Sequence, residues 1–193
     1  MRIFSRLYDL VLTWAAHPKA PRYLAALSFA ESSFFPIPPD VMLAPMVLAQ
    51  RQRAWVLAAL TTFWSVAGGM AGYFIGMFLF RLVAEPIIGF YDAQTAFDAA
   101  LAQFRTYGIW IIFLAGFTPI PYKLFTISAG LASMSLLPFV AASLVGRGAR
   151  FFLVAGLIYA GGERFQTQLR RYVDGIGWAI VAIVVVGILF LYV

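Results

Sequence analysis

The chain has 193 residues, of which 63% are apolar and 11% are charged, and it contains no cysteine. An average soluble domain carries about 25% charged residues, so this composition is that of a polytopic membrane protein. The length excludes a large catalytic domain, and the lack of cysteine excludes disulfides, thiolate metal sites and cysteine nucleophiles. The net charge of +6 indicates contact with anionic lipid headgroups and does not call for a nucleic acid partner.

Residues 1–22 predict a short helix that lies in the membrane interface. Phe4, Leu7, Val11 and Trp14 recur at helical spacing, with charged residues on the opposite face. The uncharged run within this segment is too short for a cleavable signal peptide.

Residues 23–49 are apolar enough to enter the membrane but are interrupted by prolines. Pro36, Pro38 and Pro39 each remove a backbone donor and clash with the preceding helical turn, so one straight helix is excluded. Broken backbone at membrane depth survives only where protein or water covers it. We therefore predict a re-entrant hairpin, in which two half-helices meet at a proline-rich tip and leave on the side from which they entered.

Residues 54–80 are uncharged and predict a full transmembrane helix. Gly68, Gly72 and Gly76 recur every four residues along it, and this spacing favours the close approach of another helix. We interpret the stripe as packing inside the bundle, with a seam between two copies of the chain as the alternative. Residues 91–105 then predict a second interfacial helix, because their apolar side chains share one helical face.

A second unit repeats the first. Residues 108–137 contain Pro119 and Pro121 and predict another re-entrant hairpin, followed by a transmembrane helix at 138–160. A shift of 83 positions (119 − 36) superposes the two Pro-Ile-Pro sequences. Because one span separates the hairpins, the second unit is inverted relative to the first, as in many transporters. The two units are 23–80 and 108–160.

The last apolar segment, 175–193, predicts a C-terminal transmembrane helix. The predicted fold class is therefore an all-α polytopic membrane protein, with residues 1–193 in a single integral membrane domain. Positive charges predict its orientation in the cell inner membrane: the N-terminus is cytoplasmic and the C-terminus is outside. The same orientation follows if both hairpins cross fully. With re-entrant hairpins, Arg81 and Arg105 lie outside and nine cations lie on the cytoplasmic side: Arg2, Arg6, Lys19, Arg22, Arg51, Arg53, Arg164, Arg170 and Arg171.

Five ionisable residues remain within apolar sequence: Glu31, Asp40, Lys123, Arg147 and Arg150. Such residues are costly inside a membrane and are functional candidates by default. The three cations suit a phosphate group, and the two carboxylates would balance their charge or carry protons. The alternative is that ion pairs hold the two halves together, or that the arginines extend to the interface.

Other classes of site find little support in the sequence. The single histidine, His17, lies in a loop-like stretch, so we predict no metal site and no histidine-dependent chemistry. No glycine-rich loop of the nucleotide-binding type is present. We accordingly predict no catalytic residue, no cofactor and no enzymatic activity.

These motifs resemble the DedA/VTT (SNARE-associated) membrane protein family, and its YqaA-like branch in particular. The resemblance covers about residues 25–160 and is carried by Glu31, the Phe-Pro-Ile-Pro-Pro-Asp sequence at 35–40, the glycine-rich span and the stretch 117–123. It implies two re-entrant hairpins with inverted symmetry. It also implies movement of phospholipid or polyprenyl-phosphate carriers between leaflets, which depends on protons in some members.

The family's acidic positions map by motif onto Glu31 and Asp40. Its R-F-x-P-x-x-R pattern is not kept here, because Gly116 stands at the first arginine and Lys123 matches the second only approximately. Arg147 and Arg150 are our own candidates for the missing cations.

The leading hypothesis is the transport or scrambling of an anionic lipid between leaflets, with proton coupling as an option. The predicted partners are membrane lipids with anionic headgroups. A second copy of the chain is a partner only in the alternative in which the glycine stripe forms a seam. One alternative is an ion- or proton-coupled transporter of a small solute, and another is a membrane scaffold that transports nothing. An intramembrane phosphatase is a weaker alternative, because the chain lacks a Gly-Ser-Arg-Ser-like motif.

Overall fold

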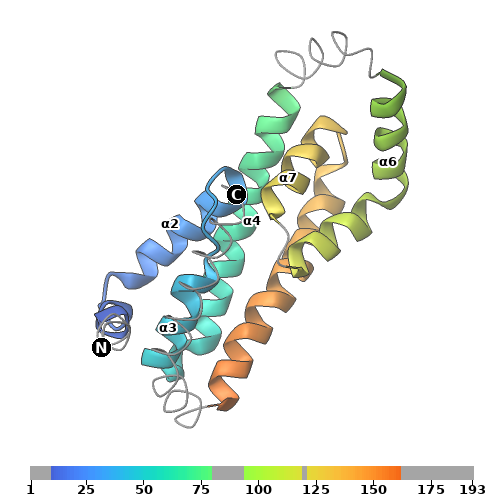
Figure 1. The fold of residues 1–193 in the computed structure, drawn as a ribbon. Coiled ribbons are helices and arrows are strands. Elements are labelled where there is room, and N and C mark those ends of the chain that lie inside the picture. Colours follow the sequence, from blue (N-terminus) through green and yellow to red (C-terminus); the bar gives the residue numbers. More distant parts are fainter. Residues whose placement is uncertain (1–9, 80–93, 119–120, 162–193) are drawn as a thin grey trace, which may run out of the picture.

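The computed structural model of the chain describes residues 10–79, 94–118 and 121–161, and these residues form helices without strands (Figure 1). The expected C-terminal span at 175–193 and the start of the expected helix at 1–22 lie outside them. In chain order the elements are a helix at 10–15, α2 (Ala20–Ser33), α3 (Asp40–Ala49), the 3-10 helix η1 (Arg51–Arg53), α4 (Ala54–Leu79), α6 (Gln94–Phe117), α7 (Tyr122–Leu131) and a helix at Leu136–Gly161.

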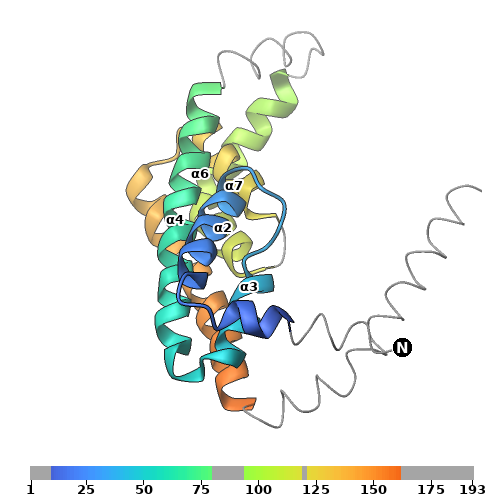
Figure 2. The ribbon, with the colours of Figure 1, turned by 90° about the vertical axis from the view of Figure 1, so that its left-hand side faces the viewer.

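Two of the described helices, α4 and Leu136–Gly161, are long and apolar enough to span a membrane. The 26 residues of α4 reach about 39 Å at 1.5 Å per residue, and a hydrocarbon core is about 30 Å thick. The two helices lie side by side in both views (Figures 1 and 2), and Trp55 of α4 stacks on Phe152 of the other.

No helix runs through the first group of prolines. Helix α2 ends at Ser33 and α3 begins at Asp40, so the residues between them include Pro36, Pro38 and Pro39. This break has the cause expected for proline, which has no backbone N–H to donate and whose ring clashes with the preceding helical turn. The chain reverses here, and α3 runs back in the direction from which α2 came (Figure 1).

Helix α6 differs from the separate interfacial helix expected at 91–105. It is continuous from Gln94 to Phe117, so the expected boundary before residue 108 is not a helix end. The reason is local, because this stretch contains no proline, and each of its two glycines, Gly108 and Gly116, costs a helix only about 1 kcal/mol. Helix α6 does change direction along its length (Figure 1), and it ends just before the second pair of prolines.

The three glycines of α4 lie where other helices of the same chain cross it. A Cβ atom on Gly68 would overlap the carbonyl oxygen of Phe29 in α2, and one on Gly76 would overlap that of Ile127 in α7. Gly72 lies between these crossings. Helix α4 therefore packs closely against α2 and α7 along this stripe.

A polar layer separates two buried apolar clusters. The first cluster includes Leu57 of α4 and Phe151 of the helix Leu136–Gly161, and the second includes Tyr73 and Phe139 of the same two helices. Between them along each helix lie the buried polar residues Ser65 and Arg147.

Candidate functional site

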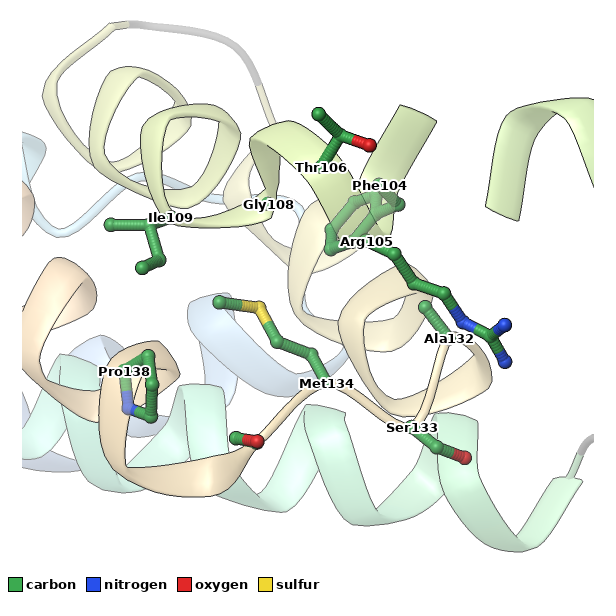
Figure 3. Close-up of a pocket in the computed structure, with 10 residues that line it drawn as sticks. Phe104, Arg105, Thr106, Gly108, Ile109, Ala132, Ser133, Met134 and Pro138 are labelled. Carbon is green, nitrogen blue, oxygen red and sulfur yellow. The ribbon is translucent and has the colours of Figure 1, made fainter. Parts of the chain in front are cut away.

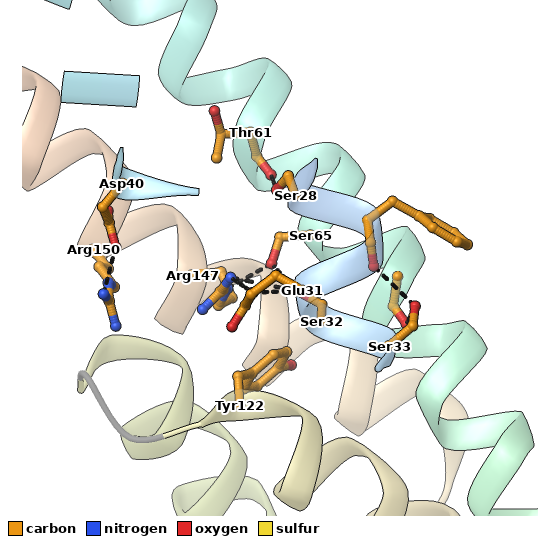
Figure 4. A network of polar contacts seen from close by, with 12 residues as sticks. Ser28, Glu31, Ser32, Ser33, Asp40, Thr61, Ser65, Tyr122, Arg147 and Arg150 are labelled. Atoms are coloured by element: carbon orange, nitrogen blue, oxygen red, sulfur yellow. Dashed lines mark hydrogen bonds and ion pairs between the residues drawn. The ribbon is translucent and has the colours of Figure 1, made fainter. Parts of the chain in front are cut away.

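The five ionisable residues predicted as a site come from four helices. Glu31 lies near the end of α2, Asp40 begins α3 and Lys123 lies in the first turn of α7. Arg147 and Arg150 lie one turn apart on the helix Leu136–Gly161. The fold brings all five to the region of the two proline breaks. Figure 4 shows Glu31, Asp40, Arg147 and Arg150 there.

Arg147 and Glu31 form an enclosed ion pair. The Arg147 side chain is only 2% exposed, and its Nη2 donates to Oε2 of Glu31 at 2.5 Å. The Arg147 Nε donates to Ser65, and Ser32 donates to the same carboxylate oxygen at 3.0 Å. Because Ser32 and Ser65 also share a 2.7 Å hydrogen bond, the four side chains form a closed ring of hydrogen bonds.

Two aromatic rings flank the Arg147 guanidinium. Its Cζ lies 4.9 Å from the centroid of the Tyr122 ring and 4.6 Å from that of Phe151, which are cation–π distances. The Tyr122 hydroxyl donates to Ser143. Arg147 thus has its charge and several of its donors already occupied, which leaves little capacity for a ligand.

Arg150 and Asp40 form a second ion pair that is more open. Nη2 of Arg150 donates to Oδ2 of Asp40 at 2.5 Å, and Nη1 donates to the backbone oxygen of Thr118 at 2.5 Å. The two charged side chains are 17% and 23% exposed. This pair ties the start of α3, after the first proline break, to the end of α6, before the second.

Lys123 has no carboxylate partner among the described residues. Its Nζ lies 3.4 Å from the backbone oxygen of Phe34, in the first proline break, and makes a weak hydrogen bond to it. An ammonium group can donate three hydrogen bonds, so Lys123 keeps donors for another acceptor.

A small cavity of about 80 Å³ joins these elements. Since one water molecule takes up about 30 Å³ in the liquid, the cavity can hold only a few waters or a small polar group. Both proline breaks contribute to its wall, and Asp40 reaches it only through Arg150. The lining residues are Glu31, Phe35, Pro36, Pro38, Pro39, Pro121, Lys123, Arg147 and Arg150.

The five charges do not cancel. Three cations and two carboxylates leave a net charge of +1 (3 − 2) when all are ionised, and Lys123 carries the excess because the other four are paired. The site therefore favours one additional negative charge close to the Lys123 ammonium.

The sequence analysis missed the uncharged members of the network: Ser32, Ser65, Tyr122 and Ser143. A polar side chain in a membrane helix is a signal in itself, since it commonly forms a hydrogen bond across a helix interface. Ser65 stands within the long uncharged run of α4, so this signal was present there.

Two further observations concern cavities and metal ligands outside the five predicted residues. A larger cavity of about 300 Å³ lies between α6 and the turn that follows α7, beside Arg105 and Ser133, and none of the five predicted residues lines it (Figure 3). Within the described ranges, no group of three or more histidine, aspartate or glutamate side chains is placed to hold a metal ion.

Comparison with known proteins places a family match over the region just described. The model of the VTT domain matches residues 37–160, which is more than half of the chain. A protein of Haemophilus influenzae is 42% identical over 187 residues, covering 97% of each chain. A protein of Histophilus somni is 42% identical over 191 residues, covering 99% of this chain and all of the relative. Both relatives are described as uncharacterized proteins, and no solved structure matches this chain.

Proposed function

This chain is a membrane protein of the VTT domain family, also called the DedA family, and we propose that it moves an anionic lipid between the two leaflets. The lipid is a phospholipid or a polyprenyl-phosphate carrier. The observation that carries the proposal is Lys123, which faces the cavity at the two proline breaks without a carboxylate partner among the described residues. Its ammonium group is suited to the phosphate of a headgroup.

The proposed architecture is a pair of inverted repeats, each with a re-entrant hairpin and a membrane span. The helix bounds support it: shifting α3 (Asp40–Ala49) by 83 residues gives 123–132, and α7 is Tyr122–Leu131. Shifting α4 (Ala54–Leu79) in the same way gives 137–162, and the corresponding helix is Leu136–Gly161. In this arrangement the hairpins are 23–49 and 108–137.

The polar layer that contains Ser65 and Arg147 lies near the membrane midplane in this architecture. Ser65 and Arg147 are midway along the two helices that are long enough to span, and both belong to the polar network. A headgroup that crosses the bilayer must pass this depth, where water is scarce and a charge is costly. A site with a net positive charge at this depth lowers the free energy cost of placing an anion there.

The two ion pairs have different proposed roles. The enclosed Glu31–Arg147 pair holds α2 against the helix Leu136–Gly161, and its closed hydrogen-bond ring supports a mainly structural role. The more open Asp40–Arg150 pair lies at the breaks, where Arg150 can turn towards a phosphate. Asp40 would then either take up a proton or stay hydrogen-bonded to part of the guanidinium. Uptake of a proton by Asp40 is the proposed route to proton coupling.

The experiment is lipid exchange in reconstituted vesicles. Phosphatidylcholine vesicles that carry a small fraction of fluorescent phosphatidylglycerol, or of polyprenyl phosphate, report movement between leaflets through quenching by an impermeant reagent. We expect wild type and Arg53→Gln to move the lipid and Lys123→Gln to lose most of that activity. Arg53 is the matched control because it also carries one positive charge, and its side-chain bond in the structure is a long one to Gln50.

Three other results would contradict this proposal. Equal exchange in protein-containing and empty vesicles, for both lipids, rules out lipid movement. A current or a solute uptake that depends on Lys123 without lipid movement would favour the small-solute transporter. Wild-type biological function in Lys123→Gln and in Asp40→Asn would favour a scaffold.

A further inference from the structure

An apolar groove of about 460 Å³ lies beside the candidate site, between the helix at 10–15, α2 and α3. This volume is in the range of small-molecule sites. Buried side chains such as Ala15 and Met46 form its floor, and exposed ones such as Val41, which is 60% exposed, form its rim. The groove presents almost entirely apolar surface, so it suits a hydrocarbon chain.

The groove and the charged cavity meet at the start of α3. Pro38 and Pro39 line the cavity, Asp40 binds Arg150, and Val41 and Met42 line the groove. These five residues are consecutive, so the polar and apolar sites share one short stretch of backbone. A molecule that binds both must have an anionic end directly attached to a long apolar part.

We propose that this groove holds one hydrocarbon chain of the lipid whose headgroup lies at Lys123. The inference rests on the proposed function and adds to it the path of the chain. From Val41 to Met46 the groove follows α3 for about 7.5 Å, at 1.5 Å per residue. Met42 and Met46 are unbranched and adaptable, so the groove accommodates chains of different shape.

The far end of the groove has the character of a membrane interface. Trp14 and Tyr23 form its rim there and are both exposed. Tryptophan and tyrosine are enriched where a bilayer meets water, because one end of each side chain is apolar and the other is polar. The groove therefore leads from the charged cavity towards one surface of the membrane.

The test uses phosphatidylglycerol with a photoreactive diazirine in one acyl chain, at a low fraction in phosphatidylcholine vesicles that contain the full chain. After illumination, mass spectrometry locates the labelled residues. We expect labelling at 41–46 in wild type, with a clear loss in Lys123→Gln, because the chain enters only when its headgroup is held. Arg53→Gln should label as wild type does.

A groove-filling variant gives a second readout. Val41→Trp should lower labelling at 42–46 and lipid exchange by about tenfold, since displacing two methylene groups from an apolar site has about that effect. Leu137→Trp is the matched control, because Leu137 is 81% exposed on a different helix. It should change neither readout.

The outcomes separate this inference from the proposed function. If wild type moves no lipid but labelling at 41–46 still depends on Lys123, the groove is supported while transport is not. If labelling at 41–46 is the same in Lys123→Gln, the groove holds bulk lipid and the inference is overturned. Absence of labelling at 41–46, as expected if another segment or a second copy fills the groove, overturns it as well.

Discussion

The guanidinium of Arg147 lies 2.5 Å from the carboxylate of Glu31, although 116 residues separate the two in the chain. The pair joins α2 to the helix Leu136–Gly161, so it links the first predicted unit to the second. Both partners are enclosed, and two serines complete their hydrogen bonds. Such a pair is costly to break because a single substitution leaves an uncompensated buried charge.

Substitutions of Glu31 and Arg147 are therefore expected to have non-additive effects on the free energy of unfolding. Arg147→Met alone should lower the free energy of unfolding by about 3–5 kcal/mol, and so should Glu31→Leu alone. The double variant should recover much of this loss, because two apolar side chains leave no buried charge. Thermal unfolding in detergent, followed by size-exclusion fluorescence, measures all four proteins. A double variant as unstable as the sum of the two single ones would contradict the enclosed pair.

Close helix packing at Gly76 is expected to tolerate no side chain. Gly76→Ala places a Cβ atom against the backbone of Ile127 and should cost about 1–3 kcal/mol of stability, as overpacking does. Gly148→Ala is the control, because its Cβ atom would lie 3.6 Å from Thr62, an ordinary contact. Thermal unfolding of the two variants should differ clearly. Equal melting temperatures would show that α4 and α7 are less closely packed than described.

The proposed re-entrant hairpins predict which loops share one side of the membrane. The chain has no cysteine, so single-cysteine variants can be labelled without interference. With a re-entrant first hairpin, His17→Cys and Gln52→Cys should react with an impermeant maleimide from the cytoplasmic side, and Thr106→Cys should react from the outside. If residues 23–49 cross fully, Gln52→Cys and Thr106→Cys exchange sides while His17→Cys does not. Labelling of intact cells and of inverted vesicles distinguishes the two topologies.

Arg51 is expected to hold the end of the helix Leu136–Gly161. Its Nη2 donates to the backbone oxygen of Tyr159 at 2.5 Å, and its Cζ lies 5.5 Å from the centre of the Tyr159 ring. Losing a charge-assisted hydrogen bond costs about 1.5 kcal/mol, so Arg51→Ala should speed amide exchange at 157–161 by about tenfold. Arg53→Ala should leave that exchange unchanged. Hydrogen exchange read by mass spectrometry tests both variants.

Composition and local pattern alone determined much of this protein. A charged fraction of 11% required a membrane environment, and the prolines between α2 and α3 required a break, since a proline acts on its own helical turn. The spacing of Gly68, Gly72 and Gly76 predicted a close helix crossing for the same kind of local reason. In α6 local pattern misled, because the change from polar to apolar residues near residue 105 was not a helix end.

Only the tertiary structure decided which charges pair. The sequence offered Glu31 and Asp40 as partners for three cations, and no local pattern assigns an ion pair across more than 100 residues. The crossing of the helices puts Arg147 beside Glu31 and Arg150 beside Asp40, and it leaves Lys123 without a carboxylate among the described residues. Because a charge–charge interaction weakens with distance, the positions of the charges in space decide which of them pair, and they single out Lys123 as the residue that we propose to bind an anion.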